Sequence, residues 1–149
     1  MMTETYPKIY LYKRIIQAKL FIDTQYSNYI DLNNIADEAC FSKFHFIRLF
    51  KTIYGSTPHQ YLTRVRIDNA RLFLQKGVSV AETCMNVGFD SISSFAALFK
   101  RYTRMGPADY KKQFKKRNEE IIKHPLRFIP NCFAEKKGWT IKSNFQEAS

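Results

Sequence analysis

Apolar residues recur every three or four positions along most of the chain up to residue 117, a spacing typical of amphipathic helices. The first such stripe consists of Ile9, Tyr12, Ile16 and Leu20. It predicts a helix that turns these four residues toward a core. A short second helix is predicted over 31–40, with Asp31 as its N-cap.

The stretch FSKFHFIRLFKTIY at 41–54 predicts a third helix, with Ser42 as N-cap. Its apolar residues stand at i, i+3, i+4 and i+7, so they form one face that must be buried: Phe46, Leu49, Phe50 and Ile53. Gly55 and a Ser-Thr-Pro turn end this helix.

A long helix then begins with Thr57 as N-cap and Pro58 at its first position, and Gly77 is its expected C-terminal glycine. The Ser79-x-x-Glu82 capping box predicts another short helix from Val80. From Ser91 the apolar face of the third helix is repeated by Phe95, Leu98, Phe99 and Tyr102, and Met-Gly-Pro opens a last helix through Tyr110 and Phe114.

The two halves of the chain are an internal duplication. FIRLFK at 46–51 reappears as FAALFK at 95–100, 49 residues later, and Pro58 and Tyr61 reappear as Pro107 and Tyr110. Each copy has a short helix, a tight turn and a longer helix, which is the helix-turn-helix plan. The predicted fold is therefore all-α, with two homeodomain-like helix-turn-helix subdomains joined by a long linker helix. The predicted boundaries are a lead at 1–8, subdomains at 9–57 and 78–117, the linker helix at 58–77, and an extension at 118–149.

The net charge of the chain indicates the class of its partner. The 149 residues hold 24 Lys and Arg against 13 Asp and Glu, a formal net charge of +11. Between Lys100 and Arg117 there are eight basic residues and one acid, Asp109. This excess favours a polyanionic partner, and the alternative is a solvated basic face without one.

Other classes of function find little support in the sequence. It shows neither a long apolar run nor a signal-peptide pattern, so a cytoplasmic, nucleoid-associated protein is expected. Three scattered histidines and three cysteines form no metal-binding or catalytic spacing, so no enzyme, metal or cofactor is expected. Cys40 and Cys84 fall in apolar helical patterns and are interpreted as small hydrophobes rather than redox sensors. Cys132 lacks the histidine that a methyl-accepting cysteine would need.

Four segments carry a family resemblance: IADEACFSKFHFIRLFK, GSTPHQYL, RIDNARLFL and VGFDSISSFAALFKRYTRMGPADY. Together they resemble the DNA-binding domain of the AraC/XylS family of bacterial transcriptional regulators, over roughly residues 9 to 114. The resemblance implies a regulator that places two recognition helices in successive major grooves of double-stranded DNA. Activation is implied rather than repression, with RNA polymerase as a further partner. A deep, narrow RNA major groove would not admit such a helix.

In the first unit the resemblance places Phe44, Ile47 and Arg48 on the groove-facing side, and helical spacing agrees because they oppose the apolar face. We expect Arg48 to contact a guanine, and Phe44 and Ile47 to contact thymine methyls. The alternative for the two apolar residues is ordinary packing against the linker helix. Lys43, His45 and Lys51 are expected to contact phosphates, although His45 alone could be a solvated surface histidine.

The second unit predicts weaker base recognition. Its groove-facing residues by the same alignment are short or lack donors: Ile92, Ser93, Ala96 and Ala97. Lys100, Arg101 and Arg104 are expected to hold phosphates, with specificity left to apolar contact or to DNA bending.

The start of the sequence leaves no space for a ligand-binding domain, so control by abundance and a monomer on DNA are expected. The alternative is that 118–149, which contains Trp139 and scattered aromatics, supplies the input as a docked element, a small hairpin or a frayed tail. A helical protein-interaction or architectural module without sequence readout is the alternative function.

Overall fold

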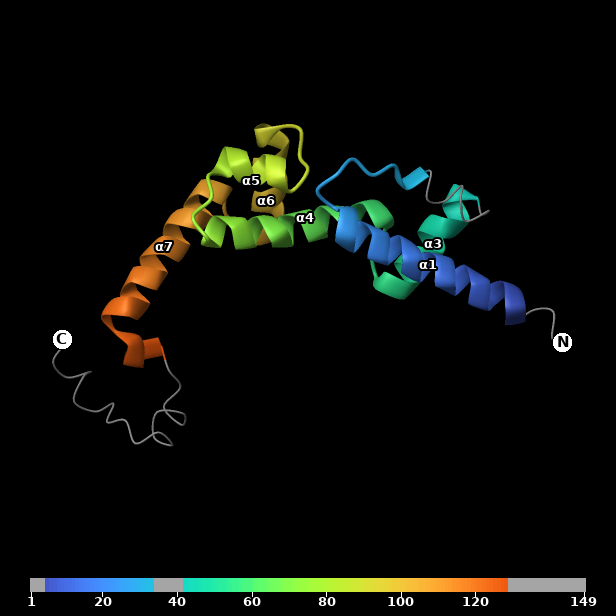
Figure 1. Cartoon of the computed structure of the whole chain (residues 1–149), viewed down its shortest axis with the longest axis horizontal. Helices are drawn as coiled ribbons and strands as arrows, with labels where there is room; N and C mark the ends of the chain where they lie inside the picture. The colour runs from blue at the N-terminus through green and yellow to red at the C-terminus, as the bar shows by residue number, and fades with distance from the viewer. Residues whose placement is uncertain (1–4, 34–41, 129–149) are drawn as a thin grey trace.

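The computed structural model describes residues 5–33 and 42–128, and within them every regular element is a helix. The elements are α1 (Thr5–Gln25), α3 (Lys43–Tyr54), α4 (Pro58–Gln75), α5 (Val80–Asn86), α6 (Ile92–Thr103), α7 (Pro107–Lys123) and a short 3-10 turn, η1 (Pro125–Phe128). Helix α4 runs through the middle of the molecule, with α1 and α3 at one end and α5, α6 and α7 at the other (Figure 1). The prediction of two helical units on one linker helix is confirmed. The helix expected over 31–40 lies mostly outside the described residues.

Local capping signals fix where most of these helices begin. Ser42, Ser79 and Ser91 each accept a hydrogen bond from the backbone N–H three residues later. The Ser79 cap has only this forward bond, so the capping box predicted with Glu82 does not close. A complete box forms at the start of α4, where the side chains of Thr57 and Gln60 cap each other's backbone N–H groups. Asp31 accepts from the N–H of Asn33, as an N-cap would.

The apolar stripes of α3 and α6 each anchor one core. Phe46 and Phe50 are buried in the first core, and Phe95 and Phe99 are buried in the second. A tyrosine from the following helix packs edge-on against each core. The ring centre of Tyr61 lies 5.7 Å from that of Phe50, and the ring centre of its repeat Tyr110 lies 5.3 Å from that of Phe99. The predicted burial is confirmed for these four phenylalanines. Leu49, Ile53 and Leu98 are partly buried against the cores, and Tyr102 is 42% exposed at the end of α6.

The predicted inward face of α1 is wrong. Ile9, Tyr12, Ile16 and Leu20 are all about half exposed, and the opposite face is buried through Ile15, Ala18 and Ile22. Helix α1 has apolar residues on both sides, so a spacing of three and four fits either face. The face that packs is the one that α3 and α4 cover.

Polar contacts tie each core to its neighbours. The Tyr61 hydroxyl donates to Asp23 Oδ1 at 2.6 Å, and Lys19 Nζ lies 2.8 Å from Asp23 Oδ2. Burial, followed by this hydrogen bond, raises the pKa of Tyr61, so the hydroxyl stays protonated and keeps its role as donor. In the second unit Gln75 Nε2 donates to the Tyr110 hydroxyl at 2.7 Å. Both tyrosines therefore pack on an aromatic core and also bond to a neighbouring helix.

Helix α7 continues to Lys123, so the first residues of the predicted 118–149 extension are helical. Residues 129–149, including Cys132 and Trp139, lie outside the described residues, as does Cys40. Cys84 is buried, and burial raises the pKa of its thiol, which fits the predicted role of a small hydrophobe. None of the described helices is both long and apolar enough to span a membrane.

Candidate nucleic-acid interface

Helix α3 presents a mixed polar and apolar face to solvent. Because Phe46 and Phe50 anchor the opposite side, Phe44, Arg48 and Lys51 point away from the core, and Phe44 is 79% exposed. Ile47 is half-buried and packs against the first core, so it offers only part of its side chain to a ligand. This face therefore combines an arginine fork with one large apolar contact.

Helix α6 presents the equivalent face with smaller side chains. Ile92 is 51% exposed, Ser93 and Ala97 are exposed, and Ala96 is half-buried like its repeat Ile47. Ala97 occupies the position that Arg48 holds in α3. Since alanine has no side-chain donor, hydrogen bonding from this face is limited to Ser93.

Basic residues flank both exposed faces. Lys43 and His45 lie in the first turn of α3, with Lys51 near its end, and Lys100, Arg101 and Arg104 lie at the end of α6. All six side chains are exposed. Among the described residues the ion pairs are Lys19–Asp23 and Arg71–Asp68. Neither involves a lysine or arginine of α3 or α6, so these side chains can contact an anionic partner without first breaking an ion pair of this kind.

Arg104 has an unusual backbone conformation. It ends α6 in the left-handed region at φ 69°, where the first unit uses Gly55 at φ 76°. A non-glycine residue in this region costs on the order of 1 kcal/mol, because its Cβ crowds the backbone. The second unit thus tolerates strain to place an arginine beside the exposed face of α6.

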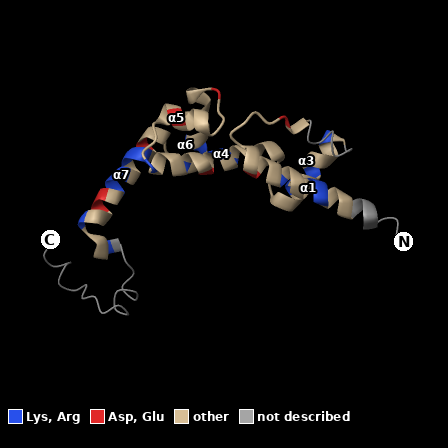
Figure 2. Cartoon of the chain, viewed as in Figure 1, with Lys and Arg blue, Asp and Glu red and all other residues tan. Residues whose placement is uncertain are grey.

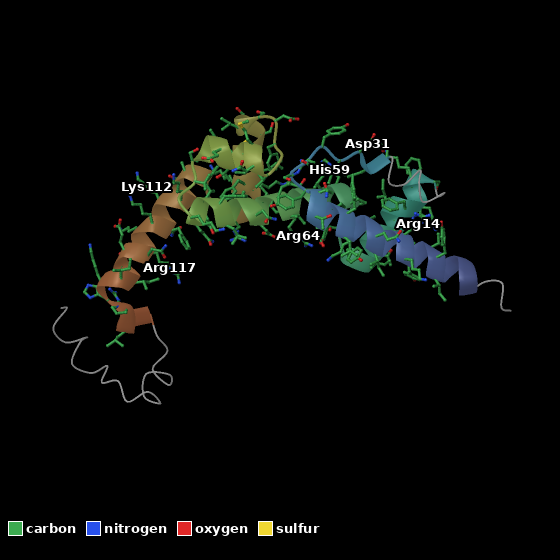
Figure 3. The ribbon with its side chains drawn as sticks, viewed as in Figure 1. Arg14, Asp31, His59, Arg64, Lys112 and Arg117 are labelled. Atoms are coloured by element: carbon green, nitrogen blue, oxygen red, sulfur yellow. The ribbon has the colours of Figure 1, made fainter. Side chains whose placement is uncertain are left out.

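The cations of α7 belong to the local charge excess between Lys100 and Arg117, but the sequence pattern predicts no role for them. Lys112 and Arg117 project from this helix (Figure 3), and Figure 2 shows basic residues along its length. Their number alone does not indicate which partner they would meet. The described residues contain no cluster of His, Cys, Asp or Glu that could hold a metal ion.

Comparison with known proteins identifies the family. The profile of a helix-turn-helix domain family matches residues 35–113, just over half of the chain. The transcriptional activator AarP of Providencia stuartii is 30% identical over 112 residues, which cover 74% of this chain and 83% of AarP. The chain belongs to the AraC/XylS family of transcriptional regulators. This AraC/XylS chain therefore carries the DNA-binding domain of a transcriptional regulator, and the family predicted from the sequence is confirmed.

Solved structures agree with the AraC/XylS assignment. The DNA-binding domain of AdpA, a global transcriptional factor, was crystallised with a target DNA. It matches with a TM-score of 0.65 and 26% identity, over 69% of this chain and 94% of that chain. A probable AraC family regulator from Rhodopseudomonas palustris shares the fold with a TM-score of 0.61, at 18% identity over 68% of this chain and 97% of that one.

This AraC/XylS chain spans only part of some relatives. An uncharacterised helix-turn-helix regulator of Haemophilus influenzae is 34% identical over 101 residues, which cover 67% of this chain but 34% of that protein. The match to a regulator of Pseudoalteromonas carrageenovora, at 33% identity, covers 65% of this chain and 58% of that protein.

Proposed function

We propose that this regulator inserts α3 and α6 into successive major grooves of an asymmetric DNA site and activates transcription from it. The observation that carries the proposal is the duplication itself. Two equivalent helices, each with its apolar side buried and its other side exposed, are held on the single helix α4. Helix-turn-helix dimers reach grooves about 34 Å apart with one reader per subunit, and two readers in one chain need no second copy. A single chain is thus the proposed DNA-bound unit.

The two readers are proposed to divide the work unequally. Arg48 of α3 donates two hydrogen bonds to a guanine, and Phe44 and Ile47 contact thymine methyls beside it. Lys43, His45 and Lys51 contact phosphates and set the register of α3. The first unit therefore supplies most of the direct base recognition.

The second unit is proposed to recognise DNA chiefly through its backbone. Ile92, Ser93, Ala96 and Ala97 allow α6 to approach the groove closely but supply one side-chain donor. Lys100, Arg101 and Arg104 hold the flanking phosphates, and sequence preference arises from apolar contact and DNA deformability.

Activation is the part of the proposal that rests on relatives. AarP is named a transcriptional activator, and a relative in Staphylococcus xylosus, 25% identical over 124 residues, is named a lactose operon transcription activator. By the same likeness we propose that the DNA-bound chain contacts RNA polymerase.

Arg48→Ala tests the reader assignment. We expect it to lower affinity for the preferred site about 5- to 150-fold, which corresponds to roughly 1–3 kcal/mol for a lost bidentate base contact, and to change affinity for unrelated duplex much less. Arg101→Ala is the matched control, because a lost phosphate contact weakens both complexes by the same factor. Fluorescence anisotropy on both duplexes measures the four ratios. If Arg48→Ala weakened binding to the preferred site and to the unrelated duplex by the same factor, as Arg101→Ala should, Arg48 would not read a base.

A further inference from the structure

The turn that follows α1 lies directly against the turn that follows α5. Gly88 has φ +90°, and a Cβ at this position would lie 2.8 Å from the carbonyl oxygen of Ser27 and 3.0 Å from that of Tyr26. A side chain would collide with backbone here, and backbone cannot move aside as a flexible side chain can. Glycine at 88 therefore lets the second unit touch the first through the main chain.

An arginine from the linker helix closes the same contact. Arg66 Nε donates to the Tyr26 carbonyl oxygen at 2.7 Å, and its Nη2 donates to that of Asn28 at 3.0 Å. Its guanidinium lies 5.6 Å from the centre of the Phe89 ring. One side chain thus holds the first-unit turn through two hydrogen bonds and the second-unit turn through a cation–π contact.

The environment of Arg66 is consistent with a structural role for its charge. Burial lowers the pKa of Arg66, and the carboxylate of Asp90 partly opposes this effect. Because guanidinium is the most basic side-chain group in proteins, Arg66 stays charged and keeps its full set of donors at neutral pH. The Tyr26 side chain packs against both hydrophobic cores beside it.

These contacts restrict the motion of the two units relative to each other, which α4 alone does not. Helix α4 contributes Tyr61 and Leu62 to the first core and Ile67, Ala70 and Leu74 to the second. Each unit is therefore fixed to α4, but a helix joining two units leaves them free to bend and twist relative to each other. The contact between the two turns adds a second connection beside the helix, and two separate connections restrict both motions.

We propose that Arg66, Gly88 and Phe89, closed on the turn 26–28, form an inter-unit clamp that fixes the separation and angle of α3 and α6. The clamp thereby sets the distance between the two half-sites that DNA must present. This inference rests on the two-groove binding proposed above. One inserted base pair moves a half-site by about 3.4 Å and turns it by about 35° around the DNA axis, since a turn of about 34 Å holds about 10 base pairs. A clamped pair of helices cannot follow that displacement.

The first experiment examines the clamp without DNA. Spin labels are attached through Thr52→Cys and Tyr102→Cys on the exposed sides of α3 and α6, with Cys40 and Cys132 replaced by serine and the buried Cys84 left in place. Pulsed dipolar spectroscopy then gives the distribution of label distances. We expect a narrow distribution in this parent and a broadened one after Arg66→Ala. Arg71→Ala is the matched control, because Arg71 is on the same helix but contacts Asp68 of α4 and Tyr110 of the second unit.

The second experiment measures affinity for a series of sites whose half-sites are moved apart or together by one and two base pairs. The parent and Arg71→Ala are expected to lose affinity on the order of tenfold for each base pair, and Arg66→Ala less than about threefold. Arg66→Lys keeps the charge without the fork that reaches both carbonyls, so it should fall between them. It also serves if Arg66→Ala does not fold, as judged by circular dichroism.

The outcomes separate the clamp from the proposed function. A distance distribution and a spacing profile that stay sharp in both Arg66 variants would overturn the clamp while leaving two-groove binding intact. A parent that binds every spacing equally would overturn two-groove binding and, with it, the role of the clamp in half-site spacing. The distances in free protein would then still decide whether the clamp holds the two units together.

Discussion

Phe95→Ala should lower the free energy of unfolding by about 3–5 kcal/mol, the usual cost of removing a fully buried phenylalanine side chain. Phe95 has no exposed surface and lies between Phe89 and Phe99, with ring centres 5.3 Å and 5.7 Å away. Alanine would leave a cavity among these rings that the short α5 and α6 can close only in part. Because total stabilities of domains are about 5–15 kcal/mol, this loss is a large share. Urea unfolding followed by circular dichroism measures it.

Two further substitutions make this stability measurement specific. Phe46→Ala removes the repeated residue from the first core, where it is equally buried, and should cost a similar amount. Phe44→Ala removes the same side chain from an exposed position two residues earlier and should change stability by less than about 0.5 kcal/mol. Similar losses for Phe44→Ala and Phe95→Ala would contradict the packing described for the two units.

DNA affinity should fall by about 10³-fold or more between 50 and 200 mM salt. Each phosphate neutralised by a lysine or arginine releases condensed counterions, so the logarithm of affinity falls linearly with the logarithm of salt concentration. The exposed basic residues beside α3 and α6 support on the order of six or more neutralised phosphates, which predicts a slope of about −5 or steeper. A salt titration of anisotropy gives this slope directly.

Single substitutions at the end of α6 should each reduce the magnitude of that slope by about 1. Lys100→Ala and Arg101→Ala remove exposed cations from the helix. Arg104→Gly removes a third while relieving the left-handed backbone at φ 69°, so it should weaken DNA binding without destabilising the fold. Lys76→Ala, an exposed cation at the end of α4, is the control and should leave the slope unchanged. An unchanged slope in all three α6 variants would mean that this end of α6 does not meet phosphate.

The sequence predicted most of the fold because the signals involved are local. Ser42, Thr57 and Pro58 mark helix starts through contacts within one turn, and α3 and α6 each concentrate their apolar residues on one side. Helix α1 could not be oriented in this way, since both its sides are apolar and the buried side depends on helices far along the chain.

The long-range contacts of the inter-unit clamp could not be predicted from the sequence pattern either. Gly88 and Arg66 look like an ordinary turn glycine and an ordinary basic residue of a helix, yet both contact the turn 26–28, about 40 or more residues away in sequence. The positive φ at Arg104 could not be predicted from the residue type itself. Only the match of position 104 to Gly55 in the repeat could have indicated it, because arginine itself does not favour that conformation.

Two-groove binding is tested most directly by selecting bound duplexes from a random DNA library with the intact chain at moderate salt. We expect an asymmetric enriched site of roughly 20 base pairs, with one sharply defined half, read by α3, and a less defined half about one turn away. The sharp half should disappear when the selection is repeated with Arg48→Ala. Salt-sensitive binding that enriches no sequence would contradict base recognition by α3 and α6, because the basic residues would then bind DNA without any reading of its sequence.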